Sequence, residues 1–279
     1  MKKISRRSFL AAAGLSVAAL ALTACGGSSS SVASSVASSA ASSEAASTSA
    51  VAGELTTVEA GKLTMATNAA FPPYEMTTDA GEFEGIDIET AQAIADKLGL
   101  ELQIDDMDFD AALLSVQQGK ADIVMAGVTV TDERKAVMDF SDSYATGIQS
   151  IIVPEGSDIA SPDDLAGKKI GTQRGTTGYI YCSDDFGDDA VVAYDDGLTA
   201  VQALNNGQVD AVVIDNAPAQ EFIAANPGLK ILDTSYAEED YAIGMAKGSS
   251  LEDAVNAALK ELKADGTLQS IVDKYITAE

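Results

Sequence analysis

The sequence contains no histidine, no tryptophan and only two cysteines among its 279 residues. The lack of histidine removes the commonest general base and the commonest zinc ligand, and with them most Ser-His hydrolases and histidine-containing metal sites. Enzymes that work through carboxylates remain possible. From the sequence we expect no bound metal ion and no cofactor.

Basic residues are also scarce, with 17 lysines and arginines against 43 aspartates and glutamates. Four of the basic residues, and none of the acidic ones, lie within the first 24 positions, so the rest of the chain is more acidic still. A polyanion such as nucleic acid is repelled by a surface of this charge. The composition excludes nucleic acid as an expected partner.

No hydrophobic run reaches the roughly 20 residues that a bilayer span needs. The longest, residues 9–24, follows a basic segment and precedes Cys25, which is typical of an export signal. Residues 22–25 (LTAC) resemble the bacterial lipobox, which implies a lipidated Cys25 that anchors the mature protein to the cell membrane, outside the cytoplasm. An ordinary signal with a chance cysteine is the alternative. Residues 5–10 (SRRSFL) resemble the twin-arginine motif, and the export route stays open.

The segment from Gly26 to Gly53 is composed mainly of serine and alanine, with one charge at Glu44. Such a segment buries too little apolar surface to fold, so we expect residues 25–53 to form a disordered tether behind the lipidated cysteine. With Cys25 modified, only Cys182 remains, and no intramolecular disulfide can form. Cys182 is either a reactive thiol or a buried hydrophobe.

Residues 54–279 alternate short apolar runs with helical patterns, which predicts an α/β fold. One predicted helix is capped by Asp87 and stopped by Gly99. Another follows a capping-box pattern of Ser250 and Asp253 and ends before Gly266.

A partial repeat relates two helix-strand units at an offset of 88 residues. Each unit reads helix, glycine turn, aspartate and buried strand; the matched positions are Ala112, Val116, Gly119, Asp122 and Val124 with Ala200, Leu204, Gly207, Asp210 and Val212. A second pair of similar units places Gly-Lys before a strand at residues 61–66 and 167–171. The domain is therefore expected to have two similar lobes. Because ligands collect at the carboxyl ends of strands in open α/β sheets, Asn68 and Gly127 should face Gln173 and Asp215 across a cleft.

An arginine fork and an acid on opposite sides of such a cleft would suit a zwitterion. Arg134 can bind a carboxylate bidentately, and Asp215 ends an apolar strand. The alternative is that Arg134 pairs with Asp132 or Asp139 and that Asp215 caps the next helix. Residues 173–178 (QRGTTG) offer backbone amides at a helix start, a weak anion-binding signal on its own. Phe71 is either a stacking surface or a core residue.

The ordered set of motifs resembles the polar amino-acid-binding proteins of ABC importers. The segments that carry the resemblance are residues 63–74 (LTMATNAAFPPY), 84–89 (EGIDIE), 119–134 (GKADIVMAGVTVTDER), 139–144 (DFSDSY), 164–177 (DLAGKKIGTQRGTT), 207–215 (GQVDAVVID) and 262–267 (LKADGT). The resemblance implies a monomer of the two-lobed type 2 periplasmic-binding-protein fold with a two-stranded hinge. The first lobe would comprise about 60–147 with 241–279 and the second about 148–240, and an ABC permease would receive the ligand.

The resemblance also implies roles for individual residues. Arg134, the Thr129 hydroxyl and backbone groups near Thr177 would hold the ligand's α-carboxylate. Asp215, the Gly127 carbonyl and Thr129 would hold its α-ammonium group. Side-chain contacts would come from the remaining positions, which are Asn68, Phe71, Phe109, Ala126 and Gln173.

Asn68 departs from the family pattern, because relatives that bind cationic amino acids often have aspartate there. An amide carries no charge, so a neutral polar ligand is expected unless Asp108 or Asp110 supplies one. Two other functions stay open. One is an enzyme resembling the cyclohexadienyl dehydratases, with Glu75 as its acid or base, and the other is a sensory protein that reports to a receptor.

Overall fold

The computed structural model describes residues 55–276. The expected signal peptide, Cys25 and the tether lie outside these residues. None of the helices in the described part has the length and apolarity that crossing a membrane requires.

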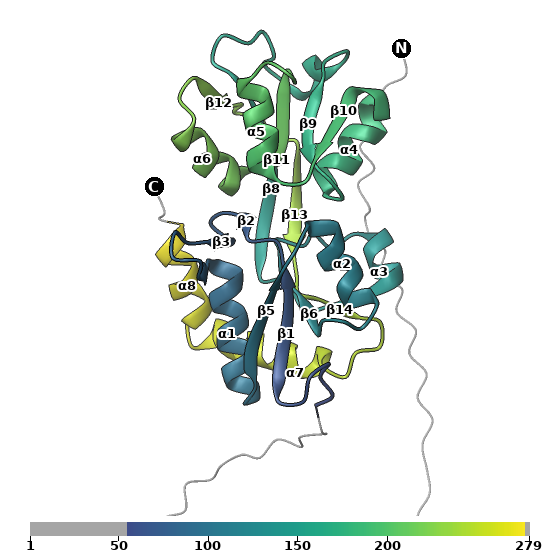
Figure 1. The fold of residues 1–279 in the computed structure, drawn as a ribbon, viewed down its shortest axis with the longest axis vertical. Helices are drawn as coiled ribbons and strands as arrows, with labels where there is room; N and C mark the ends of the chain where they lie inside the picture. The colour runs from purple at the N-terminus through teal and green to yellow at the C-terminus, as the bar shows by residue number, and fades with distance from the viewer. Residues whose placement is uncertain (1–54, 277–279) are drawn as a thin grey trace, which may run out of the picture. The chain divides into compact units, whose positions relative to one another are not determined.

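The first lobe is built on a five-stranded sheet of order β5-β1-β6-β14-β7 (Figure 1). Its strands are β1 (Lys62–Thr67), β5 (Glu101–Asp106), β6 (Ile123–Val124), β7 (Met138–Phe140) and β14 (Gly244–Ala246). Its helices are α1 (Ile86–Leu98), α2 (Phe109–Gln117), α3 (Asp132–Val137), α7 (Glu252–Ala264) and α8 (Thr267–Tyr275). The C-terminal helices return to pack on α1, so the first lobe is built from both ends of the described chain. A small sheet of β2 (Ala70–Phe71), β3 (Glu75–Thr77) and β4 (Phe83–Glu84) lies beside α1.

The second lobe repeats this arrangement with the order β10-β9-β11-β8-β12. Its strands are β8 (Ala145–Pro154), β9 (Ile170–Gln173), β10 (Val191–Tyr194), β11 (Ala211–Asp215) and β12 (Leu229–Ile231). Its helices are α4 (Thr177–Phe186), α5 (Gly197–Asn205) and α6 (Asn216–Ala225), with short 3-10 turns η1 (Pro162–Leu165) and η2 (Asp188–Ala190). In each sheet the first three strands are parallel and the fourth is antiparallel to the third.

Two strands join the lobes. The first part of β8, from Ala145 to Ile148, pairs only with the antiparallel strand β13 (Ala237–Tyr241), and from Gln149 onward β8 belongs to the second sheet. Figure 1 shows β8 and β13 running between the two lobes. The two-lobed α/β fold with a two-stranded hinge is thus confirmed.

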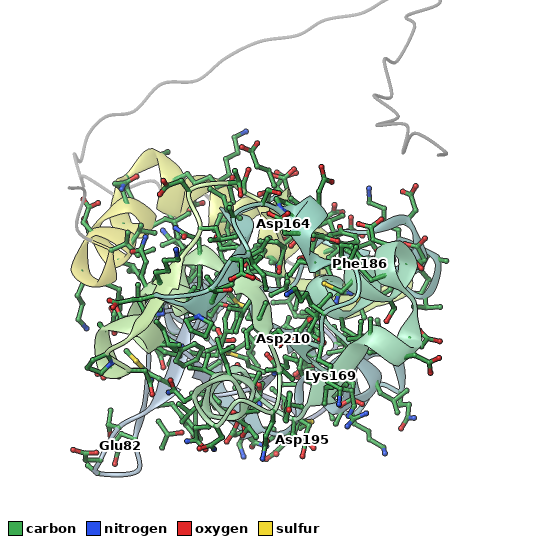
Figure 2. The ribbon with its side chains drawn as sticks, turned by 90° about the horizontal axis from the view of Figure 1, so that it is seen from above. Glu82, Asp164, Lys169, Phe186, Asp195 and Asp210 are labelled. Carbon is green, nitrogen blue, oxygen red and sulfur yellow. The ribbon has the colours of Figure 1, made fainter. Side chains whose placement is uncertain are left out.

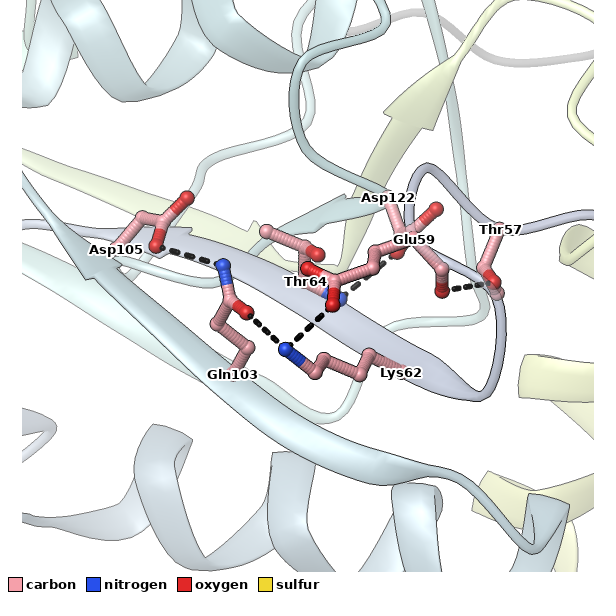
Figure 3. A network of polar contacts seen from close by, with 7 residues as sticks. All are labelled: Thr57, Glu59, Lys62, Thr64, Gln103, Asp105 and Asp122. Carbon is pink, nitrogen blue, oxygen red and sulfur yellow. Dashed lines mark hydrogen bonds and ion pairs between the residues drawn. The ribbon is translucent and has the colours of Figure 1, made fainter.

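The repeat at an offset of 88 residues is present in the structure. Helices α2 and α5 begin and end at equivalent positions, and the glycine after each has a positive φ, 66° at Gly119 and 67° at Gly207. The side chain of Asp122 accepts a hydrogen bond from the Thr64 amide at 2.8 Å, while its own amide donates to the Thr64 carbonyl (Figure 3).

The equivalent aspartate in the second lobe, Asp210, has the same pair of hydrogen bonds with Lys169. Both residues are labelled in Figure 2. The repeated aspartates therefore fix the starts of neighbouring parallel strands.

Two predicted helix caps were wrong. Helix α1 starts two residues earlier than expected, after Gly85, and Asp87 lies in its first turn with its carboxylate buried. Helix α7 starts at Glu252 and has no side-chain cap. The residue before it is the buried Leu251, whose amide donates to the Ser249 hydroxyl, so Ser250 lies in the preceding turn. The stop at Gly99 is confirmed, since this residue adopts φ 70° and its amide closes the helix.

Cys182 lies on α4 and is fully buried in the core of the second lobe. Burial raises the pKa of its thiol to about 12, so the thiolate is absent at neutral pH. Cys182 therefore behaves as a small hydrophobe and not as a reactive thiol.

Candidate functional site

A pocket lies between the lobes at the carboxyl ends of the parallel strands. All ten residues predicted from the sequence line it, together with five that were not included in that set. The full lining is Asn68, Phe71, Glu75, Phe109, Ala126, Gly127, Thr129, Arg134, Gln149, Gln173, Thr176, Thr177, Val213, Ile214 and Asp215.

Arg134 lies on α3 and reaches into the pocket with only 8% of its surface exposed. Its guanidinium donates through Nη1 to the Thr129 carbonyl at 2.7 Å and through Nη2 to the Gly175 carbonyl in the second lobe at 3.2 Å. The guanidinium carbon lies 5.4 Å from the centre of the Phe109 ring. Asp139 pairs with Lys247 instead, and Asp132 makes no ion pair with the arginine among the described residues. The surface ion-pair alternative for Arg134 is therefore wrong.

Asp215 ends β11 and is buried, with 8% of its surface exposed. Although it precedes α6, its side chain makes no capping bond. It accepts hydrogen bonds from the Tyr241 hydroxyl and from Gln149 Nε2, the latter at 2.7 Å. Burial is the main cause that raises its pKa to about 7. Among the described residues no lysine or arginine pairs with it, so a cation in the pocket would find a carboxylate without a counter-ion.

The loop after β9 leads directly into α4 at the pocket. Thr176 caps this helix, since its hydroxyl accepts a hydrogen bond from the Tyr179 amide at 3.3 Å. Thr176 and Thr177 line the pocket, which places the amino end of a ten-residue helix beside Arg134. The positive end of a helix dipole and a guanidinium together favour an anion at this point.

Phe71 forms one wall of the pocket. Its ring stacks on Tyr74 with 5.9 Å between centroids. A Cβ atom at Gly127 would come within 2.9 Å of the Phe71 ring, and Gly127 also has φ 54°. Glycine is required here because it lets the backbone carrying the 127 carbonyl approach the aromatic wall.

Three buried acids lie in or beside the pocket, and the sequence analysis did not predict the structural roles that they have there. Glu75 was named only as a possible acid or base, yet it is fully buried and neither of its carboxyl oxygens has a hydrogen-bond partner among the described residues. Asp87 accepts from the Gly127 amide and the Tyr144 hydroxyl. Glu239 is buried on β13, where strand alternation with the buried Tyr241 could have revealed it.

Burial is the largest cause that raises the pKa of Glu75 well above its usual value, and Asp87 raises it further. The pKa of Asp87 itself rises to about 6, again because of burial. Two facing acids in one apolar environment ionise together only at high cost. Burial and the nearby Asp87 therefore favour the neutral form of Glu75.

The arrangement offers binding groups of opposite sign on opposite lobes. Arg134 and the start of α4 suit an anion, and Asp215 suits a cation. Among residues 55–276, no group of three or more histidine, cysteine, aspartate or glutamate side chains is arranged to hold a metal ion.

Comparisons with known proteins identify the family of the chain. Over 226 residues the chain is 33% identical to the L-cystine-binding protein TcyJ of Escherichia coli (strain K12), covering 79% of this chain and 85% of that protein. It is 33% identical over 230 residues to the arginine-binding extracellular protein ArtP of Bacillus subtilis (strain 168), covering 78% and 87%. A solved structure described as an ancestral arginine-binding protein bound to glutamine matches with a TM-score of 0.75 at 41% identity, covering 78% of this chain and 99% of that one. Residues 63–278 match the profile of one family, and the chain belongs to the bacterial extracellular solute-binding proteins, family 3.

Proposed function

We propose that this protein captures a polar L-amino acid between its two lobes and delivers it to an ABC-type permease in the membrane. The observation that carries the proposal is the placement of Arg134 and Asp215 on opposite lobes, facing one pocket. A zwitterion that contacts both lobes favours the closed form over the open one, which is the condition for ligand-driven closure.

The backbone of the ligand takes its orientation from the charges. Its α-carboxylate lies against the Arg134 guanidinium and the amino end of α4 at Thr177. Its α-ammonium group lies against the Asp215 carboxylate and the Gly127 carbonyl. This orientation leaves the ligand side chain between Phe71 and Phe109, with Asn68, Ala126 and Gln173 at its far end.

The ligand side chain is proposed to be polar and uncharged. Asp108 and Asp110 are exposed and do not line the pocket, so they do not supply a charge to it. Two acids line it: Asp215, which is assigned to the α-ammonium group, and Glu75, whose pKa burial raises well above its usual value, which favours its neutral form. Relatives are named for cystine, arginine, histidine and glutamine, and a neutral pocket favours an amide ligand of the glutamine kind over lysine or arginine.

Delivery rather than catalysis or sensing is inferred from the same observations. The relatives named above are binding proteins, and the pocket places groups of opposite charge on opposite lobes, as a zwitterionic ligand requires. Cys25, once lipidated, would hold the domain at the outer face of the cell membrane, where a permease operates. The protein is proposed to act there as a monomer.

The test is titration calorimetry of residues 54–279 with the twenty L-amino acids and L-cystine, after unfolding and refolding to remove carried-over ligand. We expect a dissociation constant in the micromolar range or below for one polar amino acid, and its loss in Arg134→Ala. Conversion of prephenate or arogenate to an aromatic product would instead support the enzyme.

A further inference from the structure

Glu239 is a buried carboxylate at the centre of the hinge. It lies on β13, and its Oε2 atom accepts three hydrogen bonds: from the Thr129 hydroxyl at 3.1 Å, the Thr177 hydroxyl at 3.0 Å and Gln149 Nε2 at 3.0 Å. Thr129 belongs to the first lobe and Thr177 begins α4 in the second, and both line the pocket. Glu239 itself does not line the pocket.

The direction of these hydrogen bonds limits what the two threonines can offer a ligand. A hydroxyl has one proton to donate and two lone pairs that accept. Because a carboxylate oxygen only accepts, the protons of Thr129 and Thr177 both point at Glu239. The two hydroxyl oxygens also lie 3.5 Å apart, where either could donate to the other. The shorter contacts to Glu239, at 3.1 and 3.0 Å, assign both protons to the carboxylate and leave the lone pairs for the pocket.

We propose that Glu239 is a positioning residue that turns the Thr129 and Thr177 hydroxyls into acceptors and thereby makes the pocket select ligands that carry an α-ammonium group. This inference rests on the proposed function and assigns a cause to its selectivity. An ammonium group has three donors and can engage a hydroxyl from each lobe while it contacts Asp215.

The geometry also divides the work between the two ends of the ligand. The Thr129 hydroxyl was expected to serve both the α-carboxylate and the α-ammonium group. With its proton held by Glu239, it serves the ammonium group alone, and the carboxylate depends on Arg134 and the backbone amides that begin α4. Gln149 Nε2 donates to both Glu239 and Asp215, which ties the acceptor hydroxyls to the acid that meets the same ammonium group.

The test compares Glu239→Met, which keeps the volume but removes the acceptor, with Glu239→Gln, which keeps an acceptor oxygen and removes the charge. Affinities are measured for two matched pairs of probes. These are L-glutamine with 4-carbamoylbutanoate, and L-arginine with 5-guanidinopentanoate; the second member of each pair lacks only the α-amino group.

In Glu239→Met the hydroxyl protons become free to face the pocket. We expect affinity for the bound amino acid to fall about tenfold or more, while its deaminated analogue keeps or gains affinity. Glu239→Gln should retain most of the wild-type preference, because its side-chain oxygen can face the three donors. Thr129→Val and Thr177→Val should each weaken the amino acid more than the analogue, which tests the proposal without altering position 239.

Equal losses for both members of a pair in Glu239→Met would overturn the proposal, because they would show a structural role alone. An unchanged preference in Glu239→Met and in both valine variants would overturn it too. If the wild-type protein bound none of the four probes and no other amino acid, the proposed function would fail together with this inference, a result distinct from either of the others.

Discussion

The side-chain amide of Gln173 donates a hydrogen bond of 2.8 Å to Asn68 Oδ1, which joins the two lobes across the pocket. Each residue is also held from its own lobe: Asn68 Nδ2 donates to the Met107 carbonyl at 3.0 Å, and Gln173 to the Asp195 carbonyl at 3.2 Å. This buried amide pair closes the far end of the pocket without introducing charge.

Asn68→Asp places a negative charge at this pair. We expect the ratio of affinities to shift toward L-arginine and L-lysine over L-glutamine by about tenfold, because a partly buried carboxylate pairs with a cationic side chain. Competition calorimetry with the three amino acids measures the ratio. Gln173→Glu, which puts an acid on the other lobe, should shift the ratio in the same direction, and no shift in either variant would refute this assignment of the side-chain end.

Arg134→Ala should weaken amino-acid binding by about 2–5 kcal/mol, since it leaves the buried ligand carboxylate unpaired. That corresponds to roughly thirtyfold to several-thousandfold in the dissociation constant. Arg174→Ala is the matched control, because Arg174 is an exposed arginine in the loop between β9 and α4, close to the same pocket. Comparable losses in both variants would argue against carboxylate binding by Arg134.

Binding should weaken as pH falls below about 7. The pKa of Asp215 is raised to about 7 in the unliganded protein, and only the ionised carboxylate attracts an ammonium group. The affinity should therefore fall by up to about tenfold for each pH unit below that value. Titrations between pH 5 and 8 measure this dependence, and Asp215→Asn should bind weakly with a flatter profile.

Stability should fall as pH rises from about 4 to 7. Glu75, Asp87 and Asp215 have pKa values raised in the folded state, so the folded protein binds more protons than the unfolded chain. Their contribution is complete below the unfolded values and is lost as pH rises through the folded ones.

Glu75→Gln isolates the contribution of one buried acid. It should raise the melting temperature at pH 8 and flatten the profile, because the amide stays neutral beside Asp87. Glu82→Gln is the control, because Glu82 is exposed at a loop on the surface (Figure 2) and its replacement changes net charge alone. Equal effects of the two substitutions would mean that net repulsion, and not burial, governs the profile.

Cys25→Ala should release the protein from membranes and leave amino-acid affinity unchanged, because the lipid supplies the anchor and the domain supplies the site. Fractionation of cells into membrane and soluble parts, with immunoblotting, measures the release. Retention on washed membranes in Cys25→Ala would contradict lipid anchoring.

Residues at the ends of strands were found from the sequence, because an apolar run followed by Asn68, Gly127, Gln173 or Asp215 marks the point where a buried strand leaves its sheet. The internal repeat predicted the two lobes for a similar reason. Helix starts were less predictable. Aspartate is a common helix cap, but the buried carboxylate of Asp87 accepts a hydrogen bond from the Gly127 amide instead.

The sequence did not predict the buried residues that hydrogen-bond to the pocket residues and hold them in place. Gln149 and Glu239 meet only because β8 and β13 pair in the hinge, 90 residues apart along the chain. No local pattern reports such a contact. The alternation of β13 shows that Glu239 points inward, but its partners come from both lobes and from the other hinge strand.

The strand-start aspartates, Asp122 and Asp210, lie at the end of each sheet opposite the pocket. Because strand register is set there by main-chain partners, it does not depend on which side chains stand at 68 or 173. Substitutions at the pocket can accordingly change ligand preference while the sheets keep their pairing. Both lobes separate strand register from ligand contacts in this way, so the fold can acquire new ligand preferences while its sheets stay unchanged.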